Sequence, residues 1–177
     1  MNVCVFCGSS FGNSLIYEDT AKQVGDLIAS TGSTLIYGGG KVGLMGAVAD
    51  AVILASGKAI GVIPDFLYKR EVAHIGLTEL HIVSSMHERK MKMADLADVF
   101  IALPGGLGTL DELVEILTWK QLGLINKPVA LLNTNSYFDF FILQLKKMSQ
   151  EGFLQEASVD DLIVKTNPNQ LFSSFLL

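Results

Sequence analysis

The feature that most constrains this chain is a regular alternation of short apolar runs, rich in valine and isoleucine, with segments of helical periodicity. Apolar and polar side chains do not alternate within the runs, so both faces of the resulting sheet must be covered. Strands that alternate with helices form a parallel sheet with right-handed crossovers. The sequence therefore predicts an α/β fold, a doubly wound parallel sheet with helices on both faces.

The expected elements run from one end of the chain to the other. Strands are expected at residues 2–7, 33–38, 58–63, 80–84, 98–104 and 127–133. Helices are expected at residues 14–31, 43–55, 86–97, 109–122 and 136–150, and again after Pro168. The helix at 43–55 carries one charged residue, Asp50, and a helix so apolar is buried in the core or in a subunit interface. A chain of 177 residues without an internal repeat predicts one domain, residues 1–177.

Composition and charge argue against two broad classes of partner. Half of the residues are hydrophobic, but no run reaches the roughly 18 apolar residues of a membrane span. The first residues lack the basic and apolar regions of a signal peptide, so a cytoplasmic protein is expected. The net charge is −5, and the one basic cluster is the short segment HERKMK (87–92), so we expect no nucleic-acid partner.

The two cysteines, Cys4 and Cys7, have CxxC spacing inside an apolar run. Positions three apart on a strand point to opposite faces of the sheet. A redox pair needs a helix N-terminus, and a zinc site needs further ligands nearby. Buried core thiols are therefore favoured, with a redox or metal role as the alternative. The histidines His74, His81 and His87 show no ligand spacing, so we expect no metal and no cofactor.

Two glycine-rich segments each follow an expected strand and open an expected helix: YGGGKVGLMG (37–46) and PGGLGT (104–109). Both lie at the carboxyl edge of the sheet, where doubly wound folds bind ligands. Glycine lets backbone N–H groups approach a ligand, and a helix N-terminus adds unpaired N–H groups and partial positive charge. Neither segment is a Walker A loop or a complete dinucleotide fingerprint. Two such turns on one edge predict a phosphate site, although each could serve only as a tight turn.

The acids behind the second glycine segment have two interpretations. Thr109 and Glu112 match the T-x-x-E capping box, in which the glutamate only secures its own helix end. Glu112, Glu115 and Trp119 also share one helix face, which is either solvated or lines a pocket with its acids placed for chemistry. Spacing alone leaves both interpretations open.

The segment MHERK (86–90) places Arg89 and Lys90 near the start of a helix, where the helix dipole disfavours positive charge. A solvated basic face is the ordinary explanation. The unfavourable position indicates instead that the two side chains meet an external anion, and arginine suits bidentate contact with phosphate or carboxylate.

Together, PGGLGTLDE, GGGKVGLMG and MHERK resemble the LONELY GUY (LOG) family, cytokinin riboside 5′-monophosphate phosphoribohydrolases that often carry a lysine decarboxylase label. The likeness runs from VCVFCGSS to LTWKQLGLINKPV, and the family pattern PGGxGTxxE is matched in full. The resemblance implies a Rossmann-like fold and a homodimer or larger assembly. It also implies hydrolysis of the N-glycosidic bond of N6-modified adenosine monophosphates, and of AMP, to free base and ribose 5-phosphate.

The resemblance further implies roles for single residues. Arg89 and Glu112 correspond to the catalytic pair. Leu107 stands where an aromatic residue is frequent and Asp111 where glutamate is common, which bears on the preferred base rather than on the chemistry. Substrate contacts are implied for Glu71, Lys90, Gly106, Leu107, Gly108, Thr109, Leu110, Asp111 and Thr118.

These residues suggest a division of labour. The N–H groups of residues 105–109, beginning at Gly105 and helped by Gly39 and Gly40, would hold the 5′-phosphate. Glu112 would stabilise the oxocarbenium charge that forms on the ribose and would orient or deprotonate the water. Glu115 would contact the ribose hydroxyls, and Arg89 would hold the substrate or assist departure of the base.

Other readings stay open at this point. A non-catalytic nucleotide-binding or carrier module on the same fold would need the glycine turns but not the Arg89–Glu112 pair. A true decarboxylase would use a cofactor-bound lysine, for which Lys90 and Lys92 are the nearby candidates. For a dimer interface, the sequence offers the apolar helix 43–55 and the segment around Trp119.

Overall fold

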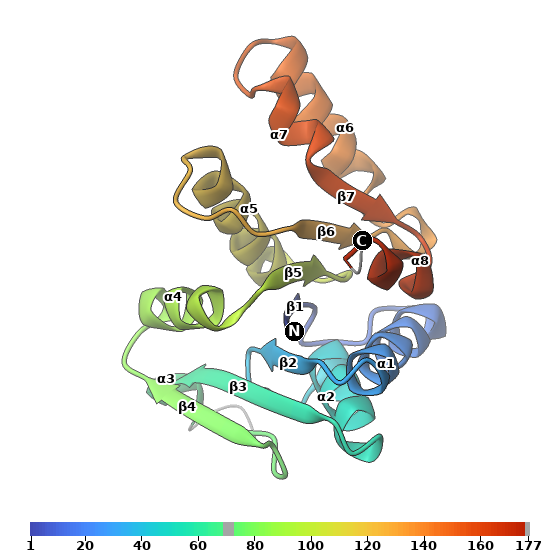
Figure 1. Ribbon diagram of the computed structural model, residues 1–177, viewed down its shortest axis with the longest axis vertical. Helices are drawn as coiled ribbons and strands as arrows, with labels where there is room; N and C mark the ends of the chain where they lie inside the picture. The colour runs from blue at the N-terminus through green and yellow to red at the C-terminus, as the bar shows by residue number, and fades with distance from the viewer. Residues whose placement is uncertain (69–72, 176–177) are drawn as a thin grey trace.

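The computed structural model contains a seven-stranded sheet in the order β4-β3-β2-β1-β5-β6-β7, with every neighbouring pair parallel (Figure 1). The structure describes residues 1–68 and 73–175. The α/β doubly wound fold is thus confirmed. The strands are β1 Asn2–Phe6, β2 Thr34–Tyr37, β3 Lys58–Pro64, β4 Glu79–Val83, β5 Val99–Ala102, β6 Val129–Leu132 and β7 Leu162–Lys165.

Six of these strands were expected and β7 was not. Its sequence, LIVK, is short and follows the charged segment around Asp160 and Asp161, so it lacks the longer apolar run of the others. It joins the sheet by pairing with β6 at the edge. The helices are α1 Leu15–Ser30, α2 Gly43–Leu54, α3 Asp65–Tyr68, α4 Met86–Leu96, α5 Leu107–Gln121, α6 Asp139–Gln150, α7 Glu156–Asp160 and α8 Pro168–Ser173, with a 3₁₀ turn η1 at Thr134–Ser136.

The helices cover both faces of the sheet, and each face has its own hydrophobic core (Figure 1). Helices α1, α2 and α8 pack on one face, and α4, α5 and α6 on the other. Cys7 belongs to the first core and Cys4 to the second, as expected for positions three apart on a strand. Both are free buried thiols, which confirms the favoured interpretation of the pair.

Helix α2 is buried by its own subunit. Its residues from Gly43 to Ala49 are all buried, and the helix packs along α1. Most of its apolar surface is therefore used in the core, while Leu54 at its end is exposed; a part of α2 in a dimer interface stays a prediction. Among the described residues, no helix is both long and apolar enough to cross a membrane.

The strand order reverses around β1, which lies between β2 and β5. The chain leaves β1 toward β2 on one side and later returns to β5 on the other side. Such a reversal opens a crevice beyond the carboxyl ends of the two strands, because the helices that follow them lie on opposite faces. The topology alone therefore places the ligand site at the ends of β1 and β5.

Candidate active site

A cavity of about 280 Å³ lies at this reversal. The turn after β1 and the first turns of α5 form most of its wall, and α2, α3 and α4 contribute one side chain each. The cavity is lined by Cys7, Gly8, Ser9, Met45, Leu67, Arg89, Gly106, Leu107, Gly108, Thr109 and Glu112.

A buried ion pair forms one side of the cavity. Arg89 Nη1 lies 2.8 Å from Glu112 Oε1, and both side chains are about nine-tenths buried. Arg89 also donates from Nε to the carbonyl oxygen of Val62, at 3.1 Å. Burial raises the pKa of Glu112 above its ordinary value, although the Arg89 charge opposes this.

The Arg89 guanidinium rests on a glycine. A Cβ atom built on Gly38 would lie 2.1 Å from Arg89 Nη2 and 3.2 Å from Met45 Sδ. No side chain fits between the end of β2 and the guanidinium, so Gly38 is required by the close approach rather than by a turn. The first glycine segment therefore contributes to the site by giving Arg89 its place.

Hydrogen bonds at the N-terminus of α4 fix the start of the helix and thereby place Arg89 and Lys90 opposite α5. The hydroxyl of its N-cap, Ser85, accepts a hydrogen bond from Glu88 N at 3.2 Å, and the Glu88 carboxylate accepts one from Ser84 N at 2.8 Å. This reciprocal pattern is close to a capping box. It fixes the helix start, so that Arg89 and Lys90 leave its first turns together.

The basic pair meets carboxylates of the protein itself, and an external anion at this pair stays a prediction. Lys90 Nζ lies 3.1 Å from Asp111 and 3.0 Å from Glu115, so the anions are the protein's own carboxylates on α5. Partial burial lowers the pKa of Lys90, but the hydrogen bonds to Glu115 and Asp111 raise it by more. The net shift of its pKa is therefore upward. Lys90, Asp111 and Glu115 thus tie α4 to α5 beside the Arg89–Glu112 ion pair.

The capping-box interpretation of Thr109 and Glu112 is also wrong. Helix α5 begins at Leu107 with Gly106 as its N-cap, two residues earlier than expected, so Thr109 lies inside the helix. The Glu112 side chain turns to Arg89 instead of its own helix end. The first backbone amide to find a carbonyl in this turn is that of Leu110, which donates to Gly106 O at 3.2 Å. The amides of a helix's first turn have no carbonyl partner within the helix, and such N–H groups suit an anion.

The turn before α2 does not offer its amides in the same way. Leu44 N and Met45 N both donate to Gly8 O, at 3.0 and 3.3 Å. Gly39 O accepts from His74 N at 3.2 Å, and Gly40 bridges Ala73. Among the described residues that line the cavity, neither Gly39 nor Gly40 occurs. The predicted help of Gly39 and Gly40 in holding phosphate therefore has no support from the geometry.

Cys7 lines the cavity, but as an unreactive thiol. Burial, with the neighbouring Glu112 charge, raises its pKa far above the ordinary value, while Arg89 opposes the shift. A thiol held in its protonated form is a poor nucleophile and a poor metal ligand. Within residues 1–68 and 73–175, no cluster of His, Cys, Asp and Glu is placed to hold a metal ion.

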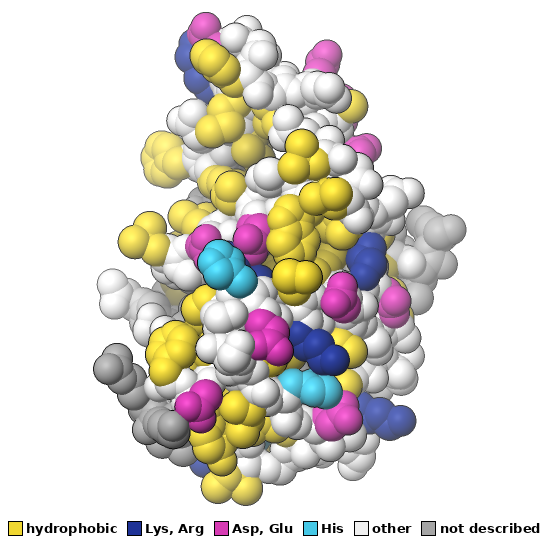
Figure 2. Space-filling model, turned by 90° about the vertical axis from the view of Figure 1, so that its left-hand side faces the viewer, with side chains coloured by type: hydrophobic (Ala, Val, Ile, Leu, Met, Phe, Trp, Pro, Cys, Tyr) yellow, Lys and Arg dark blue, Asp and Glu magenta, His cyan; other side chains and the backbone are white. Residues whose placement is uncertain are grey.

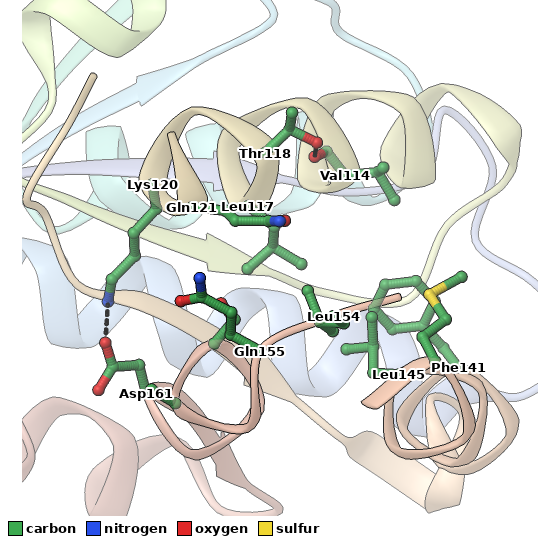
Figure 3. A pocket seen from close by; sticks show the side chains of 13 residues that line it. Val114, Leu117, Thr118, Lys120, Gln121, Phe141, Leu145, Leu154, Gln155 and Asp161 are labelled. Carbon is green, nitrogen blue, oxygen red and sulfur yellow. Dashed lines mark hydrogen bonds and ion pairs between the residues drawn. The ribbon is translucent and has the colours of Figure 1, made fainter. Parts of the chain in front are cut away.

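Thr118 lies away from this cavity. It lines a separate apolar pocket of about 300 Å³ between α5, α6 and α7, with Val114, Leu117 and Phe141 (Figure 3). An ion pair of 3.8 Å between Lys120 and Asp161 closes one end of that pocket. Glu71, the remaining implied contact, lies outside the described residues.

The face over α4 and the edge strand β4 shows how charges are distributed around the site (Figure 2). Lys and Arg side chains are scattered there among acidic ones, with a hydrophobic patch between them. Trp119 lies in a surface groove with Met91 and Leu124. Glu112, Glu115 and Trp119 therefore share the face of α5 that meets α4, and the solvated interpretation of that face is wrong.

Several residues of the cavity were not found by sequence reasoning. Gly8 and Ser9 follow β1 at the strand reversal, and their small side chains after an apolar run were the available signal. Met45 and Leu67 gave no signal, because their contact with the cavity depends on how α2 and α3 pack.

Fold and cavity together define an α/β protein of the doubly wound type, with its candidate site at the strand reversal. Comparison with known proteins gives the family. A family model described as "Possible lysine decarboxylase" matches residues 45–175. The chain belongs to this family, in the group named LONELY GUY (LOG), as its close relatives show.

These relatives include the cytokinin riboside 5′-monophosphate phosphoribohydrolase of Rhodococcoides fascians, 47% identical over 164 residues, which are 92% of this chain and 83% of that protein. An enzyme of the same name from Arabidopsis thaliana is 47% identical over 152 residues, covering 86% of this chain and 71% of that protein. A probable one from Oryza sativa subsp. japonica is 48% identical over 153 residues, 86% of this chain and 69% of that protein.

Solved structures show the same fold at lower identity. The molybdenum cofactor binding protein of Rippkaea orientalis has a TM-score of 0.74 and 23% identity, over 99% of this chain and 97% of that one. A Moco carrier protein from Chlamydomonas reinhardtii has a TM-score of 0.71 and 21% identity, over 98% of this chain and 94% of that one. At this identity the likeness shows the fold and carries no argument about the ligand.

Proposed function

We propose that this protein hydrolyses the N-glycosidic bond of N6-modified adenosine 5′-monophosphates, and of AMP, to release free base and ribose 5-phosphate. One observation carries the proposal: the buried Arg89–Glu112 pair lies in the same cavity as the start of α5. A site for a sugar phosphate needs an anion-binding turn and a carboxylate within one nucleotide's length of each other. The names of the relatives support the same reaction.

The cavity suggests how binding and chemistry are divided. The amides of Gly106, Leu107, Gly108 and Thr109 hold the 5′-phosphate at the positive end of α5. Gly105, one residue before, is packed against the Thr109 side chain, so it shapes the turn. Leu110 follows in the first turn of the helix and fixes its start through its bond to Gly106 O.

Glu112 supplies the chemistry in this proposal. The bond between C1′ of the ribose and the base nitrogen breaks, and its electron pair leaves with the base. The ionised Glu112 stabilises the positive charge that builds on the ribose. Water adds to C1′ through its oxygen, its proton passes to Glu112, and the proton returns through solvent to the departed base. A carboxylate with a raised pKa is suited to accept that proton.

Arg89 and Lys90 have different parts. Arg89 is fixed by Val62 O and Glu112, so it holds the catalytic carboxylate in place and presents charge to the cavity. Lys90 is engaged by Asp111 and Glu115, so we propose that these three act on the substrate through the spacing of α4 and α5. In place of the direct substrate contacts that the resemblance implied, the geometry supports a positioning role for all three.

We propose in addition that the protein is a homodimer. Thr118 is six residues beyond Glu112, about 9 Å along the helix, and it lines the apolar pocket of Figure 3 rather than the cavity. A substrate contact from Thr118 would therefore have to reach the site of a second copy. Exposed Phe140 and Phe153, more than four-fifths accessible, lie on α6 and the turn that follows it, near that pocket.

The two other readings are less well supported. A carrier on this fold has no need of a buried arginine–carboxylate pair at the binding turn. A decarboxylase needs a neutral lysine to form a Schiff base, whereas the acids around Lys90 raise its pKa and keep it charged. A cytoplasmic location and a single domain over residues 1–177 stay predictions.

The experiment is incubation with AMP and with an isopentenyl-type adenosine monophosphate, followed by chromatography for free base and ribose 5-phosphate. We expect both products in equal amounts from at least the N6-modified nucleotide. Tight binding of the nucleotide without either product would support the carrier reading and overturn the proposal.

A further inference from the structure

Tyr137 holds the peptide group that begins the phosphate-binding turn, although it is 32 residues away in sequence. Its hydroxyl donates a hydrogen bond to Gly105 O at 2.5 Å. Tyr137 follows the η1 turn, between β6 and α6. It does not line the active-site cavity but a neighbouring one of about 210 Å³, together with Ser10, Leu44 and Tyr17.

The bond to Gly105 O sets the direction of the next N–H group. In a trans peptide the carbonyl of one residue and the N–H of the next point to opposite sides. Gly106 lines both cavities. With Gly105 O turned to Tyr137 in one cavity, Gly106 N–H points away from it, toward the active-site cavity. Tyr137 therefore acts on the ligand through one peptide plane.

This peptide plane needs an external restraint. Both residues beside it, Gly105 and Gly106, lack a Cβ, and glycine pairs rotate their shared peptide with little steric hindrance. The preceding carbonyl, Pro104 O, is already fixed by Gly8 N at 3.1 Å. Tyr137 supplies the corresponding bond for the next carbonyl.

The segment that presents Tyr137 is strained and well fixed. Asn135 and Ser136 are consecutive non-glycine residues at φ 53° and 58°, a left-handed conformation that side chains disfavour. The Asn133 side chain accepts from Phe138 N and donates to Asp139, both at 2.7 Å. Such strain persists only where the surroundings impose it, and here it aims the Tyr137 hydroxyl at Gly105.

We propose that Tyr137 is a positioning residue for phosphate recognition: it locks the Gly105–Gly106 peptide so that Gly106 N–H faces the 5′-phosphate. The proposal rests on the phosphate-binding role of the α5 turn given above. It assigns Tyr137 to ground-state binding of the phosphate and leaves the Glu112 chemistry unchanged.

The test is Tyr137→Phe, with Tyr17→Phe as the matched control. The two tyrosine rings pack edge to face at 5.9 Å, but the Tyr17 hydroxyl makes only a 3.5 Å contact with Asn135 Nδ2. The first readout is the dissociation constant of ribose 5-phosphate by calorimetry, which needs no turnover. We expect Tyr137→Phe to weaken binding about tenfold, the weight of one hydrogen bond, and Tyr17→Phe to change it less than about twofold.

Kinetics provide the second readout. For AMP or the N6-modified nucleotide, KM should rise by a similar factor in Tyr137→Phe while kcat stays within about twofold. If both tyrosine variants bind ribose 5-phosphate like the wild type, or if kcat falls with KM unchanged, the inference is overturned. A wild-type protein that binds ribose 5-phosphate but releases no base would contradict the proposed hydrolysis and leave the binding test of Tyr137 intact.

Discussion

The turn before α2 and the turn before α5 have nearly the same sequence character, and the structure uses them differently. Each follows a strand, is rich in glycine and starts a helix at the carboxyl edge of the sheet. At α2 the first amides are taken by Gly8 O, and Gly38 lies under Arg89. At α5 the first residues line the cavity, three to six positions before Glu112.

The difference comes from one neighbouring carbonyl rather than from glycine content. Gly8 lies between the two turns: its carbonyl accepts from Leu44 and Met45 of α2, and its N–H donates to Pro104 O before α5. Gly8 alone therefore occupies the first amides of α2 and also supports the turn that leads into α5. A glycine-rich turn is an anion site only where no protein carbonyl occupies its amides first.

The largest effect on turnover should come from Glu112→Gln. Glu112 lies on α5, directly after the second turn, and the helix after the first turn has no corresponding acid at its start. The glutamine keeps the shape and a hydrogen-bond acceptor for Arg89 but removes the charge. We expect kcat on AMP or the N6-modified nucleotide to fall by about 10²–10³-fold, measured by base release. Circular dichroism should show an intact fold. A variant that loses thermal stability but keeps kcat would show that Glu112 is structural.

Gly38→Ala should have the next largest effect, since it converts the supporting role of the first turn into a clash. The new Cβ would lie 2.1 Å from Arg89 Nη2, so the guanidinium must move, while Val62 O and Glu112 hold it. If Arg89 and Glu112 act in catalysis as proposed, their displacement predicts a loss of about 10²-fold in kcat/KM. If steady-state kinetics stay within twofold of wild type, the first turn does not support Arg89.

The pH dependence of turnover should report the same carboxylate. Burial raises the pKa of Glu112, and the reaction needs its ionised form, so activity is lost as pH falls through that raised pKa. The acid limb of kcat/KM should therefore lie above about 4.3, the ordinary value for glutamate, and fall about tenfold per pH unit below it. If the acid limb of kcat/KM instead lies at the ordinary glutamate pKa, the carboxyl group that limits the rate is solvent-exposed and is not Glu112.

The smallest effect is expected from Gly106→Ala at the second turn. Nothing lies within 4 Å of a Cβ built there, and φ is −88°, so the fold should be unaffected. The methyl group would stand beside the amides that we propose bind phosphate, and it should raise KM several-fold while kcat stays nearly constant. Initial-rate measurements with AMP would show whether KM moves.

Gly39→Ala is the control at the first turn. Gly39 has φ +76°, so alanine should cost about 1–2 kcal/mol of stability there. Gly39 is not among the described residues that line the cavity, so KM for the nucleotide should not change. An increase in KM for Gly39→Ala, with none for Gly106→Ala, would reverse the roles assigned to the two turns.

The sequence was informative where local patterns decide the structure. Six strands, most of the helices and the placement of both turns at one edge follow from apolar periodicity and from βα alternation. The family pattern also located Arg89 and Glu112, which the structure brings together at 2.8 Å. The sequence did not predict β7, because a run of four residues after a charged segment is too short to show the periodicity of a strand.

What the sequence could not supply are contacts between segments far apart along the chain. The partners of Lys90 on α5, the use of α2 amides by Gly8 and the bond from Tyr137 to Gly105 all depend on tertiary packing. The start of α5 was placed two residues late because Thr109 and Glu112 imitate a capping box. The helix begins at Leu107, with Gly106 as its N-cap and Gly108 inside its first turn.

The most direct measurement is a crystal structure of the protein with AMP bound, or with ribose 5-phosphate if AMP is cleaved. The account predicts the phosphate oxygens within hydrogen-bond distance of the amides of Gly106 to Thr109, with C1′ facing the Glu112 carboxylate. A phosphate bound instead at the turn before α2, or a Glu112 carboxyl directed away from C1′, would contradict it.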